Sequence, residues 1–233
     1  MSNILALDTS TDACSASLRR DGVTESRYQL LPRQHNHLLF SMMGELLPAG
    51  PAAAGLDLLA YAHGPGSFTG LRIAASAVQG LAYSLNLPVA GVSTLACLAQ
   101  GALRRGMVDE DATLLVMLDA RINEIYWGVY RFEGGMARPY GEDRVGPPAE
   151  VPRSALGECS GAVALGSGLC HYDALPDAVR DTAGTRIEDQ WPDSRDLLPF
   201  ADELAQQGEL LGAEGVQPVY LRNEIHWKKL SEQ

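Results

Sequence analysis

The same succession of predicted elements appears twice along this chain, once in each half. An apolar segment that ends in an aspartate, residues 3–8, precedes an alternating segment over residues 13–20 and an Asp-Gly turn. In the second half, an apolar segment over residues 113–119 again ends in an aspartate, and an alternating segment follows over residues 125–130. Apolar runs are typical of buried strands, and alternating runs bounded by glycine turns are typical of hairpins. A chain of this kind is expected to fold into two similar halves.

The segments between the hairpins predict an alternation of strands and helices. Further strands are expected over residues 23–30, 57–62, 87–92 and 162–165, and helices over residues 33–47, 67–86, 93–105 and 194–207. This alternation favours an α/β fold in which residues 1–106 form a first lobe and residues 107–233 form a second. The C-terminal tail is assigned to the second lobe, and its packing against the first lobe is left open.

Two aspartates at strand ends are expected to face a cleft between the lobes. Asp8 and Asp119 hold this position, and open α/β sheets bind ligands outside the carboxyl ends of their strands. Thr9, Ser10 and Thr11 follow Asp8, and carboxylate and hydroxyl oxygens suit Mg²⁺ with a nucleotide. The same residues also suit a turn that only starts the hairpin, so both interpretations stay open.

A glycine-rich stretch, Gly64–Arg72 with the sequence GPGSFTGLR, joins a predicted strand to a predicted helix. Backbone N–H groups gather at such a turn and can hold an anion. The Lys-Ser/Thr pair of a Walker loop is missing because Leu71 and Arg72 follow Gly70, and the spacing does not match a dinucleotide-binding fingerprint. The stretch therefore predicts either an anion-binding loop or a rigid turn that caps the helix.

The histidine spacing predicts no metal site. His35 and His37 lie two residues apart in a predicted helix, so their side chains do not share a face. The position four residues after His35 is Leu39. His171 has no neighbour at a recognisable ligand spacing.

The net charge of −11 disfavours autonomous binding to nucleic acid, because phosphate backbones repel such a surface. The basic segment over residues 222–229 is the exception, and Arg222, Lys228 and Lys229 are candidates for RNA contact. The alternative is a tail that packs on the body of the protein.

Cysteine usage and hydropathy predict a cytoplasmic protein. The four cysteines are scattered and are expected to be small buried side chains in a reducing compartment. No long apolar segment and no basic leader is apparent, so neither export nor membrane association is expected.

The first two predicted helices carry more surface of apolar or small side chains than one sheet can cover. In helix 33–47 the apolar side chains span about 200° at 100° per residue, about twice the stripe of an ordinary surface helix. In helix 67–86 the side opposite the apolar face carries Arg72, Ser76, Gln79, Gly80 and Tyr83. Such surfaces are typical of protein–protein interfaces, and a homodimer would cover them as readily as a heterodimer.

Several motifs resemble those of the TsaB family, also called YeaZ. They are Ile4–Thr11 (ILALDTST), Gly64–Arg72 (GPGSFTGLR), Gly91–Leu95 (GVSTL), Asp119–Arg121 (DAR), Glu124–Trp127 (EIYW) and Pro218–Arg222 (PVYLR). The resemblance runs from residue 4 to about residue 230. It implies an actin/Hsp70/sugar-kinase-like (ASKHA) fold of two similar α/β lobes, each with a mixed sheet flanked by helices.

The resemblance also implies a role. Members of this family are the non-catalytic partner of TsaD, which transfers a threonylcarbamoyl group from threonylcarbamoyl-AMP to N6 of adenosine 37 in tRNAs reading ANN codons (t6A formation). TsaD holds a metal through a His-x-x-x-His helix, whereas here Leu39 follows His35, so neither a metal nor a catalytic residue is expected. The expected partners are TsaD, the ATPase TsaE and, through the complex, tRNA.

Two sets of site residues follow from the resemblance and from the helix surfaces. The expected TsaD interface comprises His35, Leu38, Met42, Arg72, Ser76, Gln79, Gly80 and Tyr83. A vestigial nucleotide site is expected at Asp8, Thr9, Ser10, Gly64, Gly66, Ser67 and Asp119. No tightly bound cofactor is expected there, only weak binding of ATP or ADP with Mg²⁺.

The alternative hypothesis is an enzyme that acts alone. It would be an ATP-dependent phosphotransferase or ATP hydrolase of the sugar-kinase-like fold, using Asp8, Asp119 and the glycine-rich stretch.

Overall fold

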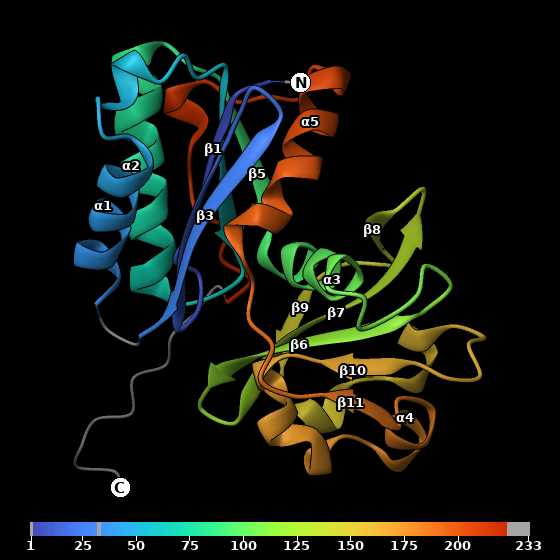
Figure 1. The fold of residues 1–233 in the computed structure, drawn as a ribbon. Helices are drawn as coiled ribbons and strands as arrows, with labels where there is room; N and C mark the ends of the chain where they lie inside the picture. Colours follow the sequence, from blue (N-terminus) through green and yellow to red (C-terminus); the bar gives the residue numbers. More distant parts are fainter. Residues whose placement is uncertain (1, 32–33, 223–233) are drawn as a thin grey trace, which may run out of the picture.

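The computed structural model of this chain describes residues 2–31 and 34–222, which form two mixed sheets flanked by helices (Figure 1). In this part of the chain, the first sheet has five strands in the order β3-β2-β1-β4-β5. The strands are β1 (Ile4–Asp8), β2 (Ala13–Arg20), β3 (Val23–Leu30), β4 (Leu58–Gly64) and β5 (Val89–Ser93). The first three pair antiparallel, while β4 and β5 extend the sheet in parallel with β1.

The second sheet repeats this topology. Within the described residues its order is β11-β10-β6-β7-β8, with β9 also paired to β7. The strands are β6 (Leu114–Arg121), β7 (Glu124–Glu133), β8 (Met136–Pro139), β9 (Arg144–Gly146), β10 (Val163–Leu165) and β11 (Thr185–Ile187). An antiparallel hairpin is again followed by two strands parallel to its first member, so the predicted repeat is confirmed.

Helices cover both faces of the first sheet (Figure 1). The helices α1 (His35–Leu46) and α2 (Phe68–Leu85) lie on one face, and α5 (Leu198–Gln207) lies on the other. Residues of β1 alternate between the two cores, because successive side chains of a strand point to opposite faces. Leu5 and Leu7 pack with α1 and α2, whereas Ile4 and Ala6 pack with α5 and with α3 (Thr94–Arg104).

Short helices complete the described chain. They are η1 (Pro51–Ala53), η2 (Pro148–Glu150), η3 (Arg153–Leu156), η4 (Ser167–Ala174), α4 (Asp177–Thr182), η5 (Ser194–Leu197) and η6 (Ala213–Gly215). None of the helices that the structure describes is both long and apolar enough to cross a membrane.

The helix predicted over residues 194–207 does not pack against the sheet of the half of the chain in which it lies. It begins as η5, continues as α5, and packs against the first sheet, where Arg19 of β2 binds both carboxylate oxygens of Asp202 at 2.6 and 2.5 Å. The sequence interpretation that made this helix part of a second α/β unit is therefore wrong. A hydrophobic stripe shows that a helix must be covered, but it does not say which sheet covers it.

The last described residues also return to the first sheet. Leu211 forms a β-bridge with Val89. The Val219 N–H donates to the His63 carbonyl at 2.7 Å, and the Tyr61 hydroxyl donates to the Gln217 carbonyl at 2.9 Å. Packing on the first lobe, left open by the sequence, therefore holds for the tail as far as it is described.

The burial of the cysteines agrees only partly with the sequence prediction. All four are free; Cys14 and Cys97 are buried, as predicted, whereas Cys159 is half-buried and Cys170 is exposed. The expectation of burial is wrong for Cys170, since its position on η4 brings it to a cavity wall.

Candidate functional site

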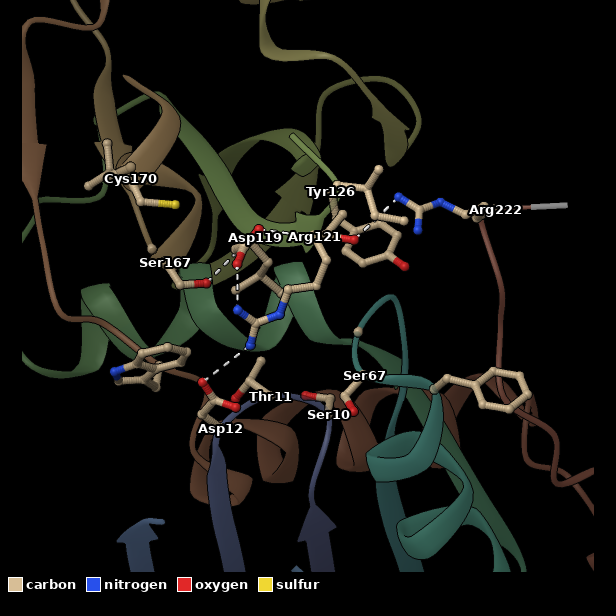
Figure 2. Close-up of a pocket in the computed structure, with 18 of the residues that line it drawn as sticks. Ser10, Thr11, Asp12, Ser67, Asp119, Arg121, Tyr126, Ser167, Cys170 and Arg222 are labelled. Atoms are coloured by element: carbon tan, nitrogen blue, oxygen red, sulfur yellow. Dashed lines mark hydrogen bonds and ion pairs between the residues drawn. The ribbon is translucent and has the colours of Figure 1, made fainter. Parts of the chain in front are cut away.

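A cavity of about 970 Å³ is lined by residues from both halves of the chain (Figure 2). Ser10, Thr11 and Asp12 reach it from the turn after β1, and Ser67 reaches it from the start of α2. Asp119 and its neighbours reach it from the end of β6. The predicted cleft therefore exists, where the ends of β1 and β6 approach each other.

The glycine-rich stretch forms one side of this cleft by packing closely on the turn after β1. A Cβ on Gly66 would overlap the Ser10 carbonyl, and a Cβ on Gly70 would overlap the Thr9 carbonyl. The Ser67 N–H donates to the Ser10 carbonyl at 2.7 Å, and the Thr9 hydroxyl donates to the Gly70 carbonyl at 2.7 Å. Ser67 also caps α2, because its Oγ accepts from the Gly70 N–H at 3.3 Å. Glycine is thus required here for close approach between two backbones.

Asp8 does not face the cleft, which corrects the sequence expectation. Its side chain is buried, and its Oδ1 accepts from the Ser10 N–H at 2.7 Å. Oδ2 has no hydrogen-bond partner among the described residues. Burial raises the pKa of Asp8 to about 6, against the lowering effect of the Ser10 hydrogen bonds. Thr9 is also buried and does not line the cavity, whereas Ser10, Thr11 and Asp12 of this turn do.

Asp119, by contrast, lies on the cavity wall. Its N–H donates to Ser167 Oγ at 3.2 Å, and its Oδ1 lies 3.4 Å from His171 Nε2. Gly166 and Gly168 permit this contact, because a Cβ on either residue would clash with Met117 of β6. The Gly166-Ser167-Gly168 sequence therefore packs η4 against the end of β6.

Arg121 extends from one side of the cleft to the other (Figure 2). Its guanidinium lies 3.0 Å from Asp119 Oδ2 and 3.7 Å from Asp12 Oδ2. Its backbone φ is 63°, and Ile122 and Asn123 follow with 55° and 58°. This left-handed conformation is uncommon for residues with a side chain, and especially for a β-branched one. No sequence motif predicted this arginine as a cleft residue, although the DAR motif contains it.

A second arginine lies at the other end of the cavity. Arg222 pairs with Glu124 and donates to the Ala120 carbonyl at 3.2 Å. It is thus an intramolecular contact between the C-terminal segment and β7. The other candidates for RNA contact, Lys228 and Lys229, lie outside the described residues.

The α1–α2 surface is only partly open. His35 and Met42 are buried, and Met42 packs in the core beneath α1, so these two residues are corrected as interface positions. Leu38 is half-buried against the same core. The apolar arc of α1 is wider than one stripe, and neighbouring elements of the same chain cover the part that carries Met42 and Leu38.

The remaining interface positions are exposed, and two of them, Arg72 and Ser76, line a groove of about 490 Å³. Tyr83 is 84% exposed, the most exposed large apolar residue in the described chain. Phe40 of α1 lines the same groove; it is one of the apolar side chains of the predicted helix 33–47 but was not among the expected interface residues. Gln79 donates to the Ala213 carbonyl at 2.9 Å, and a Cβ on Gly80 would meet no described atom within 4 Å.

The start of α2 is fixed by a stack of side chains. The Arg72 guanidinium lies 3.9 Å from the Phe68 ring centre, and the Phe68 and Tyr220 rings are 5.3 Å apart. Arg72 Nε donates to the Tyr220 hydroxyl at 3.0 Å. Gly64 also packs on the C-terminal segment, because a Cβ there would overlap the Val219 carbonyl. Gly64, at the end of β4, therefore allows the C-terminal segment to approach closely and does not line the cleft.

The repeated sheets, the flanking helices and the cleft between them define an α/β protein of the actin/Hsp70/sugar-kinase-like class. A family model described as TsaD: tRNA N6-adenosine threonylcarbamoyltransferase matches residues 29–157. The chain is similar to the Escherichia coli (strain K12) tRNA threonylcarbamoyladenosine biosynthesis protein TsaB, with 38% identity over 97% of each chain. The Haemophilus influenzae protein of the same name is 32% identical over 97% of this chain and 96% of its own length.

Solved structures agree with this relationship. YeaZ from Pseudomonas aeruginosa is 37% identical and superposes with a TM-score of 0.83 over 95% of this chain and 100% of that chain. Another structure from that organism, titled as similar to peptidase YeaZ, is 38% identical with a TM-score of 0.84 over the same shares. The chain belongs to the TsaB (YeaZ) family.

Proposed function

We propose that this chain is the non-catalytic subunit that binds and stabilises TsaD in the complex forming t6A in tRNA. The observation that carries the proposal is the exposed α1–α2 surface, in a family whose curated members are named for threonylcarbamoyladenosine biosynthesis. The ATPase TsaE is the expected third component, and the cytoplasm is the expected compartment. A net charge of −11 favours indirect contact with tRNA, through the complex.

The chemistry of the groove supports a protein partner. Phe40 is 60% exposed and Phe68 is 50% exposed, and both rings line the groove. Ser76 and Ala77 contribute small side chains to the same groove. Aromatic side chains beside small residues allow a partner helix to approach closely and to bury its own apolar side chains.

The positions that would carry chemistry are unfavourable for catalysis by this chain alone. Asp8 is buried with one oxygen bonded to the Ser10 N–H, and it does not line the cavity. Leu39, the residue four positions after His35, is a fully buried core side chain. Both arrangements favour a subunit that acts through its partner.

The test is the affinity for TsaD of the same organism, measured by calorimetry on the purified proteins. Ser76→Leu fills the groove from an exposed position, and we expect it to weaken binding at least tenfold. Gly80→Leu extends the exposed face of α2 without an internal clash and is expected to act in the same direction. Ser154→Leu, an exposed serine of η3 in the other half, is the matched control and is expected to leave binding unchanged.

Three further measurements separate the proposal from its competitors. Circular dichroism should show that each variant is folded. Unchanged TsaD affinity in the folded Ser76→Leu and Gly80→Leu variants would contradict the proposed interface. Light scattering of the chain alone reports whether a homodimer covers the same surface, and Mg-ATP turnover by the chain alone would support the alternative of an independent ATP-dependent enzyme.

A further inference from the structure

Three side chains of different ligand chemistry come together beside the cleft. Asp119, Cys170 and His171 each offer a ligand atom, and these atoms all lie within 4.8 Å of one another. Asp119 comes from the end of β6, whereas the other two come from η4. From these contacts we propose that the three residues form a binding site for Zn²⁺ or a closely similar divalent transition-metal ion.

The spacing of the ligand atoms fits a tetrahedral ion. Metal–ligand bonds of about 2.0–2.3 Å at tetrahedral angles place neighbouring ligand atoms roughly 3.2–3.6 Å apart. His171 Nε2 and Asp119 Oδ1 are already 3.4 Å apart, a long distance for a hydrogen bond. The sulfur of Cys170 lies within 4.8 Å of a ligand atom of each of the other two residues, so it is placed to become the third ligand.

The site is built on a fixed backbone. Gly168 brings η4 so close to β6 that a Cβ there would lie 2.6 Å from Met117 Cβ. Ser167 Oγ accepts from the Asp119 N–H at 3.2 Å and joins the two elements directly beside the ligands. A preformed arrangement of this kind loses little conformational entropy when an ion binds.

The side chain of Arg121 does not compete for the Asp119 oxygen that faces His171. Its guanidinium binds Asp119 Oδ2 at 3.0 Å, whereas Oδ1 is the oxygen that faces His171. The Arg121 N–H also donates to Oδ1 at 2.8 Å, which orients the carboxylate. Hydrogen bonds of this kind are typical partners of metal-ligating carboxylates.

The donor set selects the class of ion. A thiolate, an imidazole and a carboxylate suit Zn²⁺, while Mg²⁺ and Ca²⁺ favour oxygen ligands alone. Three protein ligands leave a fourth position, and Asp119 and Cys170 both line the 970 Å³ cavity, so that position is accessible from the cleft (Figure 2). The site lies on the half of the chain opposite α1 and α2, so it does not depend on the proposed interface with TsaD.

The test uses the full chain, first stripped with a chelator and then titrated with Zn²⁺ in a calorimeter. We expect one equivalent to bind, and affinity to fall at least tenfold in Cys170→Ser and in His171→Asn. Cys159→Ser and His37→Asn are the matched controls, since Cys159 is half-buried elsewhere and His37 is exposed on α1, and both should bind as the unaltered chain does. Titration with Co²⁺ adds a direct readout, because a thiolate ligand produces a charge-transfer band in the near ultraviolet.

The outcomes are decisive in both directions. Loss of binding and of the cobalt band in Cys170→Ser, with the fold retained by circular dichroism, would support the site. No binding by the unaltered chain would overturn it. Binding that survives in both Cys170→Ser and His171→Asn would also overturn it, because the ion would then be held elsewhere.

Discussion

At the scale of single residues, Asp8 and Asp119 hold equivalent positions in the repeat but have opposite surroundings. Asp8 continues the face of β1 that carries Ile4 and Ala6 and packs with α3 and α5, so this carboxyl is buried. Asp119 is only partly covered by η4 and remains on the cavity wall. The sequence presents the same pattern twice, and the difference comes from the segment that packs on each strand end.

The buried Asp8 predicts a stability that falls as pH rises. Burial raises its pKa from 3.8 to about 6, and the charges of Asp193 and Asp196 act in the same direction. The native state therefore binds the proton more tightly than the unfolded state, so stability falls between about pH 4 and pH 6 and is then constant with respect to this group. Asp8→Asn removes the ionisation and should be more stable than the unaltered chain by up to about 3 kcal/mol above pH 7, and by little near pH 4.

Urea unfolding at several pH values between 4 and 7.5 measures this difference. Asp12→Asn, at a half-exposed residue of the same turn, is the control and should show no comparable pH-dependent gain. A difference between Asp8→Asn and the unaltered chain that is the same at every pH would contradict the assignment.

At the scale of elements, α2 contains two glycines with different roles. Gly70 lies where the helix touches the Thr9 carbonyl, whereas Gly80 faces open space among the described residues. We expect Gly70→Ala to destabilise the fold by roughly 2–4 kcal/mol through overpacking. Gly80→Ala should instead stabilise it by about 0.5–1 kcal/mol, because alanine loses less backbone entropy in a helix.

Thermal and urea denaturation of the two variants provide the comparison. Both substitutions add one methyl group to the same helix, so they differ only in what the added atom meets. Equal effects of the two substitutions would show that the close contact between α2 and the turn after β1 is wrong.

At the scale of the whole molecule, the C-terminal segment binds back onto the first sheet. The Tyr61 hydroxyl is central to this contact, because it donates to the Gln217 carbonyl and accepts from the Gln217 N–H at 3.1 Å. Tyr61→Phe should cost about 1–2 kcal/mol of stability and should speed amide hydrogen exchange at Val219, which pairs with His63.

The control is Tyr172→Phe in the second half, where the hydroxyl donates to the Arg180 and Ala183 carbonyls at 3.1 and 3.0 Å. It should cost a similar free energy without changing exchange at Val219. If exchange at Val219 responded equally to both substitutions, the segment would be held by global stability and not by Tyr61.

The sequence by itself determined the repeat, the long helices and most of the strands, but not the short strands β8, β9 and β11. Apolar runs, alternation and helical periodicity are local patterns, and they gave α1, α2 and α3 to within two residues at either end. The family resemblance rested on local motifs as well, and the comparisons confirmed it.

Only the tertiary structure decided which surfaces remain open. The burial of His35, Met42 and Asp8 depends on neighbours far away in the sequence. The approach of Asp119 to His171 joins residues 52 positions apart and depends on close packing at Gly168. Spacing along the chain reports which residues share a helix or a strand, whereas contact between separate elements depends on how their backbones pack.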